Sequence, residues 1–404
     1  MQSMQKLRLK NGLVIKNRVA KAATSETMGD RRGNPQAVLL NYYRKLVTGG
    51  SGLIISGNVM VDRTARGEMG NVIVDKQTDP QLLAKWAQIG ESNGSHLWLQ
   101  LNHPGRQAPK TVNKQPVAPS AIPLTGPNAF AFNPPRELTL PEIQQIIQRF
   151  VTASMIAEQA GFSGVEIHAA HGYLLSQFLS PKVNHRTDQY GGSLANRMRI
   201  ITEIYDGIRA RTKPNFAVAI KINAGDFTPG GFTATESLAV IRQLAARGID
   251  LVEISGGSYE NPKMMGTGKV PLFVEYARKV KAAVTVPVMV TGGFRTASGI
   301  EKAVATGAAD LVGLARALVL EPNLPNKLAV GAFTAVAIPH FSTGSAKLDA
   351  KVGSLIGLAY YEQQMRRLGR HQSVKRPKTA WPILMYAMRY QGLAALVPQR
   401  GTEI

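Results

Sequence analysis

The sequence predicts a (β/α)8 barrel, and three observations point to it. Eight short β-like runs follow one another, most of them separated by segments of helical length. Several runs are almost continuously apolar, as expected of parallel strands that are covered on both faces. This alternation of strand and helix favours a closed barrel over an open sheet. The expected strands are residues 18–25, 51–61, 96–103, 164–170, 216–224, 249–257, 286–293 and 309–316.

The segments between these runs carry helical patterns. Residues 140–160 repeat apolar side chains every three or four positions, which makes one stripe along a helix. Residues 235–247 and 297–306 behave similarly and precede Gly248 and Gly307, which suit the end of a helix. The stripe of the first segment consists of Ile143, Ile146, Ile147, Phe150 and Val151.

Both ends of the chain lie outside the alternating pattern. The stretch KLRLKNGLVIKN alternates apolar and polar residues around Asn11 and Gly12, a strong signal for a β-hairpin. We expect this hairpin to plug one end of the barrel. The residues after the eighth strand lack a β pattern, so we predict a barrel domain over residues 1–325 and a basic, mostly helical C-terminal extension over residues 326–404.

A long connection follows the third predicted strand. Residues 104–141 are rich in proline and carry Phe130 and Phe132. Long irregular loops in compact domains are usually functional lids or disordered segments. We therefore predict a lid or wall over the barrel mouth.

Composition limits the function classes that the chain can support. Its 404 residues are 44% hydrophobic and 18% charged, which fills a large core and excludes global disorder. The absence of cysteine excludes disulfides, thiolate nucleophiles, zinc–thiolate sites and cysteine-ligated iron–sulfur clusters. The first residues lack the apolar core of a signal peptide, and no uncharged run approaches the ~18 residues of a membrane span. We expect a cytoplasmic protein.

The net charge of +22 is unusually high. Residues 331–404 hold ten Lys and Arg against three Asp and Glu, and residues 1–40 hold eight against two. Such a surface should attract anionic ligands, nucleic acid or an acidic membrane. A solvated basic surface without a partner is the plainer interpretation.

Polar residues gather where the predicted strands end. Active sites of α/β barrels lie at these carboxyl ends. Glycines in VTGGFRT after strand seven, with Arg316 after strand eight, offer N–H groups and a guanidinium suited to a phosphate. No GxGxxG follows a strand, and GTGK at residues 266–269 is interpreted as an ordinary turn. The polar strand ends are Ser25, Gly57, residues 100–103, residues 168–173, Lys221, residues 255–257, Gly292, Gly293 and Arg316.

One long stretch carries a specific resemblance. HAAHGYLLSQFLSPKVNHRTDQYGGSLANR at residues 168–197 strongly resembles the signature of the Old Yellow Enzyme family of FMN-dependent ene-reductases. NRVAKAATSE, LQLNHPGRQ, VTGGFRT and DLVGLAR support it in the same order, and the resemblance covers residues 5–325. Within the family the chain looks closer to the barrels related to 2,4-dienoyl-CoA reductase. It lacks their cysteines and flavin/NAD-binding extension, so we expect a stand-alone barrel without an iron–sulfur cluster.

The resemblance implies an oxidoreductase that takes hydride from NAD(P)H and reduces the C=C bond of α,β-unsaturated carbonyl compounds in a ping-pong cycle. His168 and His171 match the pair that hydrogen-bonds the substrate carbonyl oxygen, which stabilises the charge that develops on hydride attack. Tyr173 matches the acid that protonates the α-carbon. These are the expected catalytic and substrate-binding residues, and no metal ion is expected.

The resemblance also implies FMN across the barrel mouth. Ser25 lies where the family has a Thr or Cys that hydrogen-bonds flavin O4, and Gln100 matches the amide beside the pyrimidine edge. Lys221 lies where many relatives carry Arg, and either cation would stabilise the reduced flavin. Gly57 matches a small residue that lets the backbone approach the ring. The expected FMN-binding set is Ala23, Thr24, Ser25, Gly57, Gln100, Lys221, Gly292, Gly293, Ala315 and Arg316.

Three alternatives remain open at this point. A tRNA-dihydrouridine-synthase-like FMN barrel would suit the charge, but that family uses a cysteine as its proton donor and this chain has none. A metal-dependent lyase would use His168, His171 and His185, without the carboxylates that metal sites prefer. A membrane-surface flavoprotein would use the basic tail. We expect a small enone as partner and no nucleic acid, and we leave a membrane contact of the tail and a homo-oligomer open.

Overall fold

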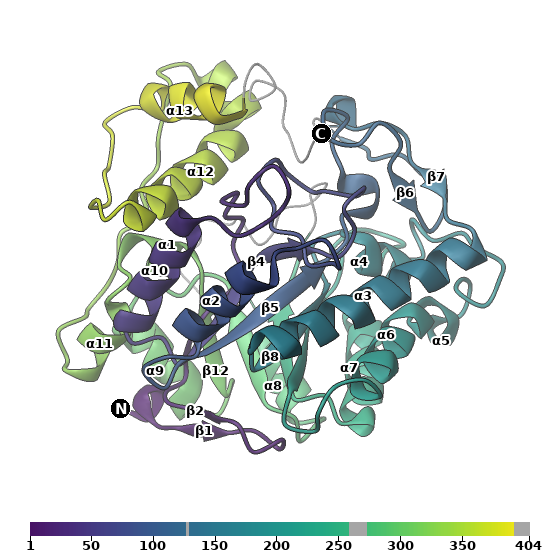
Figure 1. The fold of residues 1–404 in the computed structure, drawn as a ribbon, viewed down its shortest axis with the longest axis horizontal. Coiled ribbons are helices and arrows are strands. Elements are labelled where there is room, and N and C mark those ends of the chain that lie inside the picture. Colours follow the sequence, from purple (N-terminus) through teal and green to yellow (C-terminus); the bar gives the residue numbers. More distant parts are fainter. Residues whose placement is uncertain (127–128, 258–272, 392–404) are drawn as a thin grey trace.

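Eight parallel strands close into a barrel at the centre of the fold (Figure 1). The structure is a computed structural model that describes residues 1–126, 129–257 and 273–391, so the turn predicted at residues 266–269 lies outside the described residues. Around the barrel the strands follow the order β10-β11-β12-β3-β4-β5-β8-β9. They are β3 (Val19–Lys21), β4 (Leu53–Met60), β5 (His96–Asn102), β8 (Gly164–Ala169), β9 (Ala217–Asn223), β10 (Leu251–Ser255), β11 (Val288–Thr291) and β12 (Leu311–Leu314). Each strand lies within its predicted run, which confirms the (β/α)8 barrel.

Helices cover the outside of the barrel, as predicted from their apolar stripes. The longest helix of this layer begins with a capping box between Thr139 and Glu142 and ends at Gly161, whose φ is 97°. The helices predicted over residues 140–160, 235–247 and 297–306 are confirmed as α3, α7 and α9. The layer consists of α1 (Ala37–Thr48), α2 (Pro80–Gly90), α3 (Leu140–Ala160), α4 (Leu174–Leu179), α5 (Leu194–Arg197), α6 (Arg199–Arg209), α7 (Ala234–Arg247), α8 (Val274–Lys281), α9 (Ala297–Ala305) and α10 (Arg316–Leu320).

The predicted N-terminal hairpin is present and plugs the amino end of the barrel. After η1 (Gln2–Met4), β1 (Leu7–Arg8) pairs antiparallel with β2 (Val14–Ile15), and Gly12 takes a positive φ of 91° in the turn. Leu9 and Ile15 are buried in one cluster with barrel side chains that include Trp98 and Met289. The barrel interior is therefore closed at this end, and the opposite end is left for the site.

The connection after β5 is folded rather than extended. It contains η2 (Gly105–Gln107), β6 (Val117–Ala118), η3 (Ala129–Ala131) and β7 (Arg136–Glu137), and β6 pairs in parallel with β7. Phe130 is half exposed. The role of this connection as a lid stays a prediction.

The C-terminal extension is helical, as predicted. It contains α11 (Leu324–Ala329), α12 (Ala346–Gly369) and α13 (Trp381–Gln391). The long helix α12 packs against α1 and α10, and α13 packs on α12 (Figure 1). Met365 of α12 belongs to the main core, whereas Tyr360 and Ile383 form a separate small cluster between the two helices. Among the described helices, none combines the length and the apolarity that crossing a membrane requires.

Candidate active site

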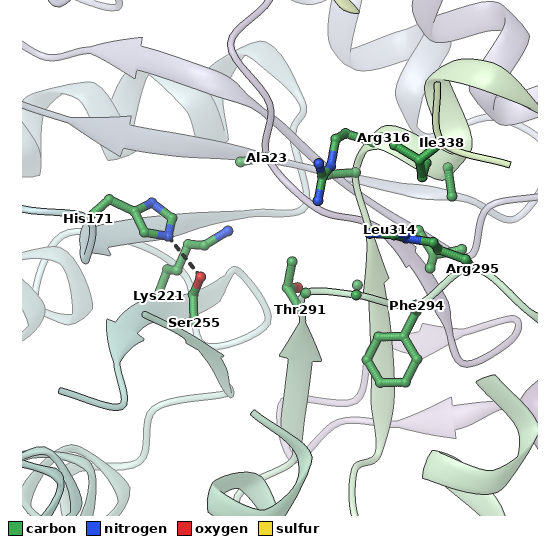
Figure 2. Close-up of a pocket in the computed structure, with 15 residues that line it drawn as sticks. Ala23, His171, Lys221, Ser255, Thr291, Phe294, Arg295, Leu314, Arg316 and Ile338 are labelled. Atoms are coloured by element: carbon green, nitrogen blue, oxygen red, sulfur yellow. Dashed lines mark hydrogen bonds between the residues drawn. The ribbon is translucent and has the colours of Figure 1, made fainter. Parts of the chain in front are cut away.

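A pocket opens at the carboxyl ends of the barrel strands, where the polar strand ends were expected to meet (Figure 2). Most of its wall comes from residues at or just after the ends of β3, β8, β9, β10, β11 and β12. Ser255, Thr291, Phe294 and Arg295 also line it; they lie in stretches that the sequence analysis singled out, but they were not among the expected catalytic or FMN-binding residues. The predicted residues that line it are Ala23, His171, Lys221, Gly292, Gly293, Ala315 and Arg316.

Three other predicted residues, Thr24, Ser25 and Gly57, lie in or against the segment that follows β3. The Thr24 hydroxyl contacts Met365 Sδ of α12 at 3.6 Å. The Ser25 hydroxyl donates a hydrogen bond to Glu68. A Cβ on Gly57 would lie 2.7 Å from the Thr24 carbonyl oxygen, so this glycine is needed for protein packing. Their contacts with FMN stay predictions.

Gln100 is buried in the barrel, below the mouth. Its side-chain amide donates to Glu166 Oε2 at 2.7 Å, and its backbone N–H donates to Ser56 Oγ at 2.9 Å. The side-chain bond holds the amide against β8, the neighbouring strand that leads to the histidines. A flavin contact of Gln100 stays a prediction.

His168, His171 and Tyr173 form one packed cluster at the end of β8. The ring centroids of His168 and His171 are 5.1 Å apart and those of His168 and Tyr173 are 4.9 Å apart, both edge to face. His168 and Tyr173 are each 3% exposed. The structure thus brings the three predicted catalytic side chains together, although His171 alone of the three lines the pocket.

The turn that carries this cluster has an uncommon backbone. His171 has a φ of 59° and Gly172 a φ of 75°, and few non-glycine residues adopt the left-handed region. The His171 backbone N–H donates to Asn223 Oδ1 at 3.1 Å, and its ring Nε2 lies 2.8 Å from Ser255 Oγ. These contacts with the ends of β9 and β10 hold the ring toward the pocket (Figure 2).

The tautomer of His168 follows from its backbone contact. The Ala170 N–H donates to His168 Nδ1 at 3.2 Å. A nitrogen that accepts a hydrogen bond carries no proton, so the proton of the neutral ring lies on Nε2. His168 therefore presents an N–H donor on its other side.

Burial and a neighbouring carboxylate keep Tyr173 protonated. Burial is the larger cause that raises the pKa of Tyr173 well above its usual range, and the charge of Glu68 raises it further. The ionised phenolate is disfavoured because it would be both poorly solvated and close to another anion. Tyr173 consequently holds its proton throughout the neutral range.

An ion pair lies beneath the pocket. Lys221 Nζ contacts Glu253 Oε1 at 2.6 Å, and the two side chains are 2% and 0% exposed. Burial would raise the pKa of Glu253, but the charge of Lys221 and hydrogen bonds hold it below its usual range. Burial and the charge of Glu253 raise the pKa of Glu166 well above its range. Glu253 therefore carries the negative charge and Glu166 the proton.

The opposite end of the pocket is suited to an anion. Arg295 and Arg316 both line it there, across from His171 and Lys221 (Figure 2). Gly292 and Gly293 have φ values of 126° and 85°, which few other residues adopt. Together they offer backbone N–H groups and two guanidinium groups, the donors that bind phosphate in barrels of this type.

A hydroxyl from the C-terminal extension lies near the two arginines of this end. Tyr361 Oη of α12 is buried and has no hydrogen-bond partner among the described residues. Burial raises the pKa of Tyr361 to about 12, against the opposing charges of Arg316 and Arg295. A buried hydroxyl without a partner is costly unless a ligand satisfies it. The residues present therefore fit the FMN that the resemblance implies, because they offer donors suited to its phosphate.

Two of these groups were missed from the sequence. Arg295 lies inside VTGGFRT, the stretch already assigned to phosphate, so a local signal was available. Tyr361 lies in the tail, and nothing in the sequence around it indicates a ligand. Within the described ranges, no group of three or more His, Asp or Glu side chains could hold a metal ion.

The amino-acid sequence is similar to those of known proteins. A profile of the NADH:flavin oxidoreductase / NADH oxidase family matches residues 5–334. The NADH-dependent flavin oxidoreductase iliE of Neonectria sp. (strain DH2) is 36% identical over 375 residues, which are 85% of this chain and 49% of that protein. The chain thus spans about half the length of this relative.

Solved structures show the same barrel. A 2-naphthoyl-CoA reductase complex superposes with a TM-score of 0.77 at 29% identity, over 82% of this chain and 52% of that one. An Old Yellow Enzyme homologue from Zymomonas mobilis superposes with a TM-score of 0.72 over 84% of this chain and 95% of that one, at 24% identity. The second likeness supports the fold alone.

The ion pair beneath the pocket gives a stability prediction. Replacing Lys221 by Met should lower the free energy of unfolding by about 3–5 kcal/mol, because Glu253 then stays buried without its cation or must take up a proton. Urea denaturation measures the loss. The double variant Lys221→Met/Glu253→Gln should recover most of it, since no buried charge remains. Equal stability of the single and double variants would show that the pair does not hold Glu253 in its charged form.

Proposed function

The chain belongs to the NADH:flavin oxidoreductase / NADH oxidase family, and from that premise we propose that it reduces the C=C bond of α,β-unsaturated carbonyl compounds. Membership in this family makes it an oxidoreductase with FMN and a nicotinamide as cofactors, and it bears out the resemblance to the Old Yellow Enzymes. The observation that carries the proposal is the packing of His168, His171 and Tyr173 at the edge of the pocket. Two imidazoles that can hydrogen-bond a carbonyl oxygen, next to a phenol that can protonate the α-carbon, suit a carbonyl compound with a conjugated C=C bond.

The two imidazoles hold and polarise the substrate oxygen in this proposal. His168 presents an Nε2–H because Nδ1 accepts from the Ala170 N–H. Ser255 holds the ring of His171, which lines the pocket. Donors fixed before the substrate arrives stabilise the enolate-like charge without having to reorganise. Binding and electronic activation of the enone are thus assigned to the same pair.

The pocket itself positions the cofactor. We assign the FMN phosphate to Arg295, Arg316 and the backbone at Gly292 and Gly293, and we assign the ring to the end near Lys221. FMN, when bound, carries hydride from the nicotinamide to the substrate. The Lys221 ammonium contributes positive charge at that end, and the carboxylate of Glu253 partly compensates this charge.

Tyr173 supplies the proton in this proposal. An ordinary phenol is already protonated at neutral pH, as a proton donor must be, and burial and the charge of Glu68 raise the pKa of Tyr173 further. A phenol is a weak acid with an ordinary pKa near ~10, yet it can protonate a strongly basic carbanion-like centre. The α-carbon of the substrate is such a centre.

Replacing Tyr173 by Phe separates the two half-reactions. Flavin reduction by NAD(P)H should remain nearly intact, whereas reoxidation by an enone such as cyclohexenone should slow by on the order of 10²- to 10⁴-fold, because only that step needs an acid. Quinones, which accept electrons without protonation at carbon, should lose much less. Stopped-flow absorbance measures each step. Equal slowing of both steps would make Tyr173 a structural residue, and an unchanged enone rate would assign the proton to another donor.

Replacing His168 and His171 together by Ala tests the oxygen site. Phenolates, which mimic the enolate, should no longer give a long-wavelength charge-transfer band with oxidised flavin, since the donors for their oxygen are gone. The flavin content itself should persist, because its proposed contacts lie elsewhere. Absorbance titration with a phenol measures this change. Phenolate affinity equal to that of the unmodified protein would place the oxygen site elsewhere.

A second observation favours a membrane-surface contact of the tail. Residues 363–391 contain seven Lys and Arg and no Asp or Glu. On α13, Trp381, Met385 and Met388 are 51%, 69% and 41% exposed. Exposed apolar side chains among cations are typical of segments that lie on anionic lipid. We therefore propose that this face rests on an acidic bilayer, with the cytoplasm as the proposed location.

Charge reversal tests that contact. The variant Arg370→Glu/Arg389→Glu should bind vesicles that contain phosphatidylserine on the order of tenfold more weakly or worse, since each cation near such a surface contributes about 1 kcal/mol. The variant Arg8→Glu/Lys10→Glu, which makes the same charge change in the N-terminal hairpin, is the matched control. Co-sedimentation compares both with vesicles of phosphatidylcholine alone. If both variants lose the same vesicle affinity, the binding depends on net charge and not on this face. If the unmodified protein does not bind the acidic vesicles, the contact is refuted.

A further inference from the structure

A second cavity lies on the C-terminal extension, outside the candidate active site. It measures about 430 Å³, and its wall comes from the end of α12, the residues just after it, and α13. Figure 1 shows these two helices packed on each other at the edge of the fold. The described residues that line this α12–α13 pocket are all different from those that line the pocket at the barrel mouth. It is therefore a separate cavity.

The described wall of the α12–α13 pocket carries four guanidinium groups and no carboxylate. They belong to Arg366, Arg367 and Arg370 at the end of α12 and to Arg389 of α13. Arg370 and Arg389 are exposed, and neither pairs with an acidic side chain among the described residues. Cations that share one cavity repel one another, so this pocket favours an anionic ligand.

Two of these guanidinium groups are held in place by the protein itself. Arg366 Nε donates to Tyr386 Oη at 3.1 Å, and its Nη2 donates to the Thr27 carbonyl at 2.8 Å. The same group lies over the Tyr390 ring, 4.8 Å from the centroid. Arg367 Nε donates to a backbone carbonyl just after α12 at 2.9 Å. Each guanidinium has five N–H donors, so donors remain for a ligand, and groups fixed in advance lose less conformational entropy when it binds.

The donors of this pocket suit a phosphate monoester better than a carboxylate. One guanidinium fork is enough to satisfy the two oxygens of a carboxylate, whereas a phosphate monoester has three acceptor oxygens and a charge of about −1.5 to −2 at pH 7. Tyr386 adds a hydroxyl, because its Oη accepts from Arg366 and its own proton has no acceptor among the described residues. Several guanidinium groups and one hydroxyl thus match a ligand that accepts hydrogen bonds from several directions.

An exposed apolar strip borders the pocket and indicates where such a phosphate comes from. Met385 lines the pocket and is 69% exposed. Trp381 and Met388, at 51% and 41% exposed, lie four positions before it and three after it, so the three share one side of α13. A free phosphate ion has no use for apolar contacts. A lipid does, because its phosphate is joined to acyl chains at the bilayer interface.

We propose that the α12–α13 pocket binds the phosphate monoester headgroup of an acidic lipid, with Trp381, Met385 and Met388 in the bilayer interface beside it. Arg370 and Arg389 contact the phosphate from the two helices, and the fixed guanidinium groups of Arg366 and Arg367 complete the site. The inference rests on the proposed contact of this face with an acidic bilayer and adds the headgroup that the face selects. Selection of a headgroup requires a shaped site, which the net charge of the tail alone does not provide.

Headgroup preference tests the pocket. Phosphatidylcholine vesicles that contain either phosphatidic acid or phosphatidylserine are adjusted to the same zeta potential and compared by co-sedimentation. The unmodified protein should bind the phosphatidic acid vesicles on the order of tenfold more tightly, because only this lipid presents a phosphate monoester. Arg370→Gln/Arg389→Gln should lose that preference. Lys375→Gln/Lys378→Gln is the matched control, since it removes the same charge from exposed residues of the same tail that do not line the pocket, and it should keep the preference.

Tryptophan fluorescence tests the lipid source of the phosphate. Trp381 is half exposed, whereas the other two tryptophans, Trp86 and Trp98, are buried in the core. Phosphatidic acid vesicles should shift the emission to shorter wavelength as Trp381 enters the bilayer interface, and Trp381→Phe should abolish the shift. Inorganic phosphate should give no shift. Vesicle binding that leaves the emission of the unmodified protein unchanged would overturn the placement of α13 in the interface.

The outcomes separate the pocket from the membrane contact on which it rests. Equal binding of both acidic vesicles, or a preference that Arg370→Gln/Arg389→Gln retains, would overturn the pocket and leave the membrane contact standing. Unmodified protein that binds neither vesicle would refute the membrane contact and the lipid source together. Calorimetric titration with inorganic phosphate then decides the remainder. Phosphate binding that the arginine variant loses and the lysine variant keeps would support a site for a soluble phosphate, and its absence would overturn the pocket as well.

Discussion

The ion pair between Lys221 and Glu253 is the interaction on which the barrel mouth depends. An ammonium group can lie beneath the pocket because Glu253, at 2.6 Å, compensates it inside the barrel. Burial and the charge of that carboxylate raise the pKa of Glu166, and Glu166 accepts a hydrogen bond from the Gln100 amide. The charged states of Lys221 and Glu253 depend on each other, since a buried charge is tolerated only beside its counter-charge. Removing one member therefore changes the protonation of the others as well as one contact.

A second constraint is the left-handed turn at the end of β8. The positive φ values of His171 and Gly172 reverse the chain within two residues, so that Tyr173 returns to pack against His168. A regular strand end would have sent successive side chains to opposite faces. The strain of a non-glycine residue in this region is offset by the bonds of His171 to the ends of the two following strands. The relative positions of the three side chains in the proposed reaction thus depend on the backbone conformation of this turn. Hydrogen bonds to the ends of β9 and β10 stabilise that conformation.

Features that are determined by residues close together in the sequence could be predicted from the sequence. All eight strands, the hairpin and three helices follow from apolar periodicity and turn residues. So does the meeting of Gly292, Gly293 and Arg316 at one pocket, since they come directly after two neighbouring strands. The partners of Ser25 could not be predicted in the same way. Glu68 and Glu362 lie 43 and 337 positions away in the sequence and meet Ser25 only through tertiary packing. The position of Tyr361 near the arginines also depends on tertiary packing. In the sequence, a tyrosine on a long helix shows no pattern that distinguishes a ligand-binding residue from a core residue.

The tail packs against the barrel mouth, and its Ile338 lines the pocket. The inner side of α12 brings Glu362 to Ser25, Met365 to Thr24 and Tyr361 toward the arginine end of the pocket. Its last turn and the segment after it carry cations and no acid, which suits contact with an anionic surface. The one glutamate of α12, Glu362, is buried on the side that faces Ser25. One helix, α12, thus carries both the buried contacts with the segment after β3 and the start of the basic stretch.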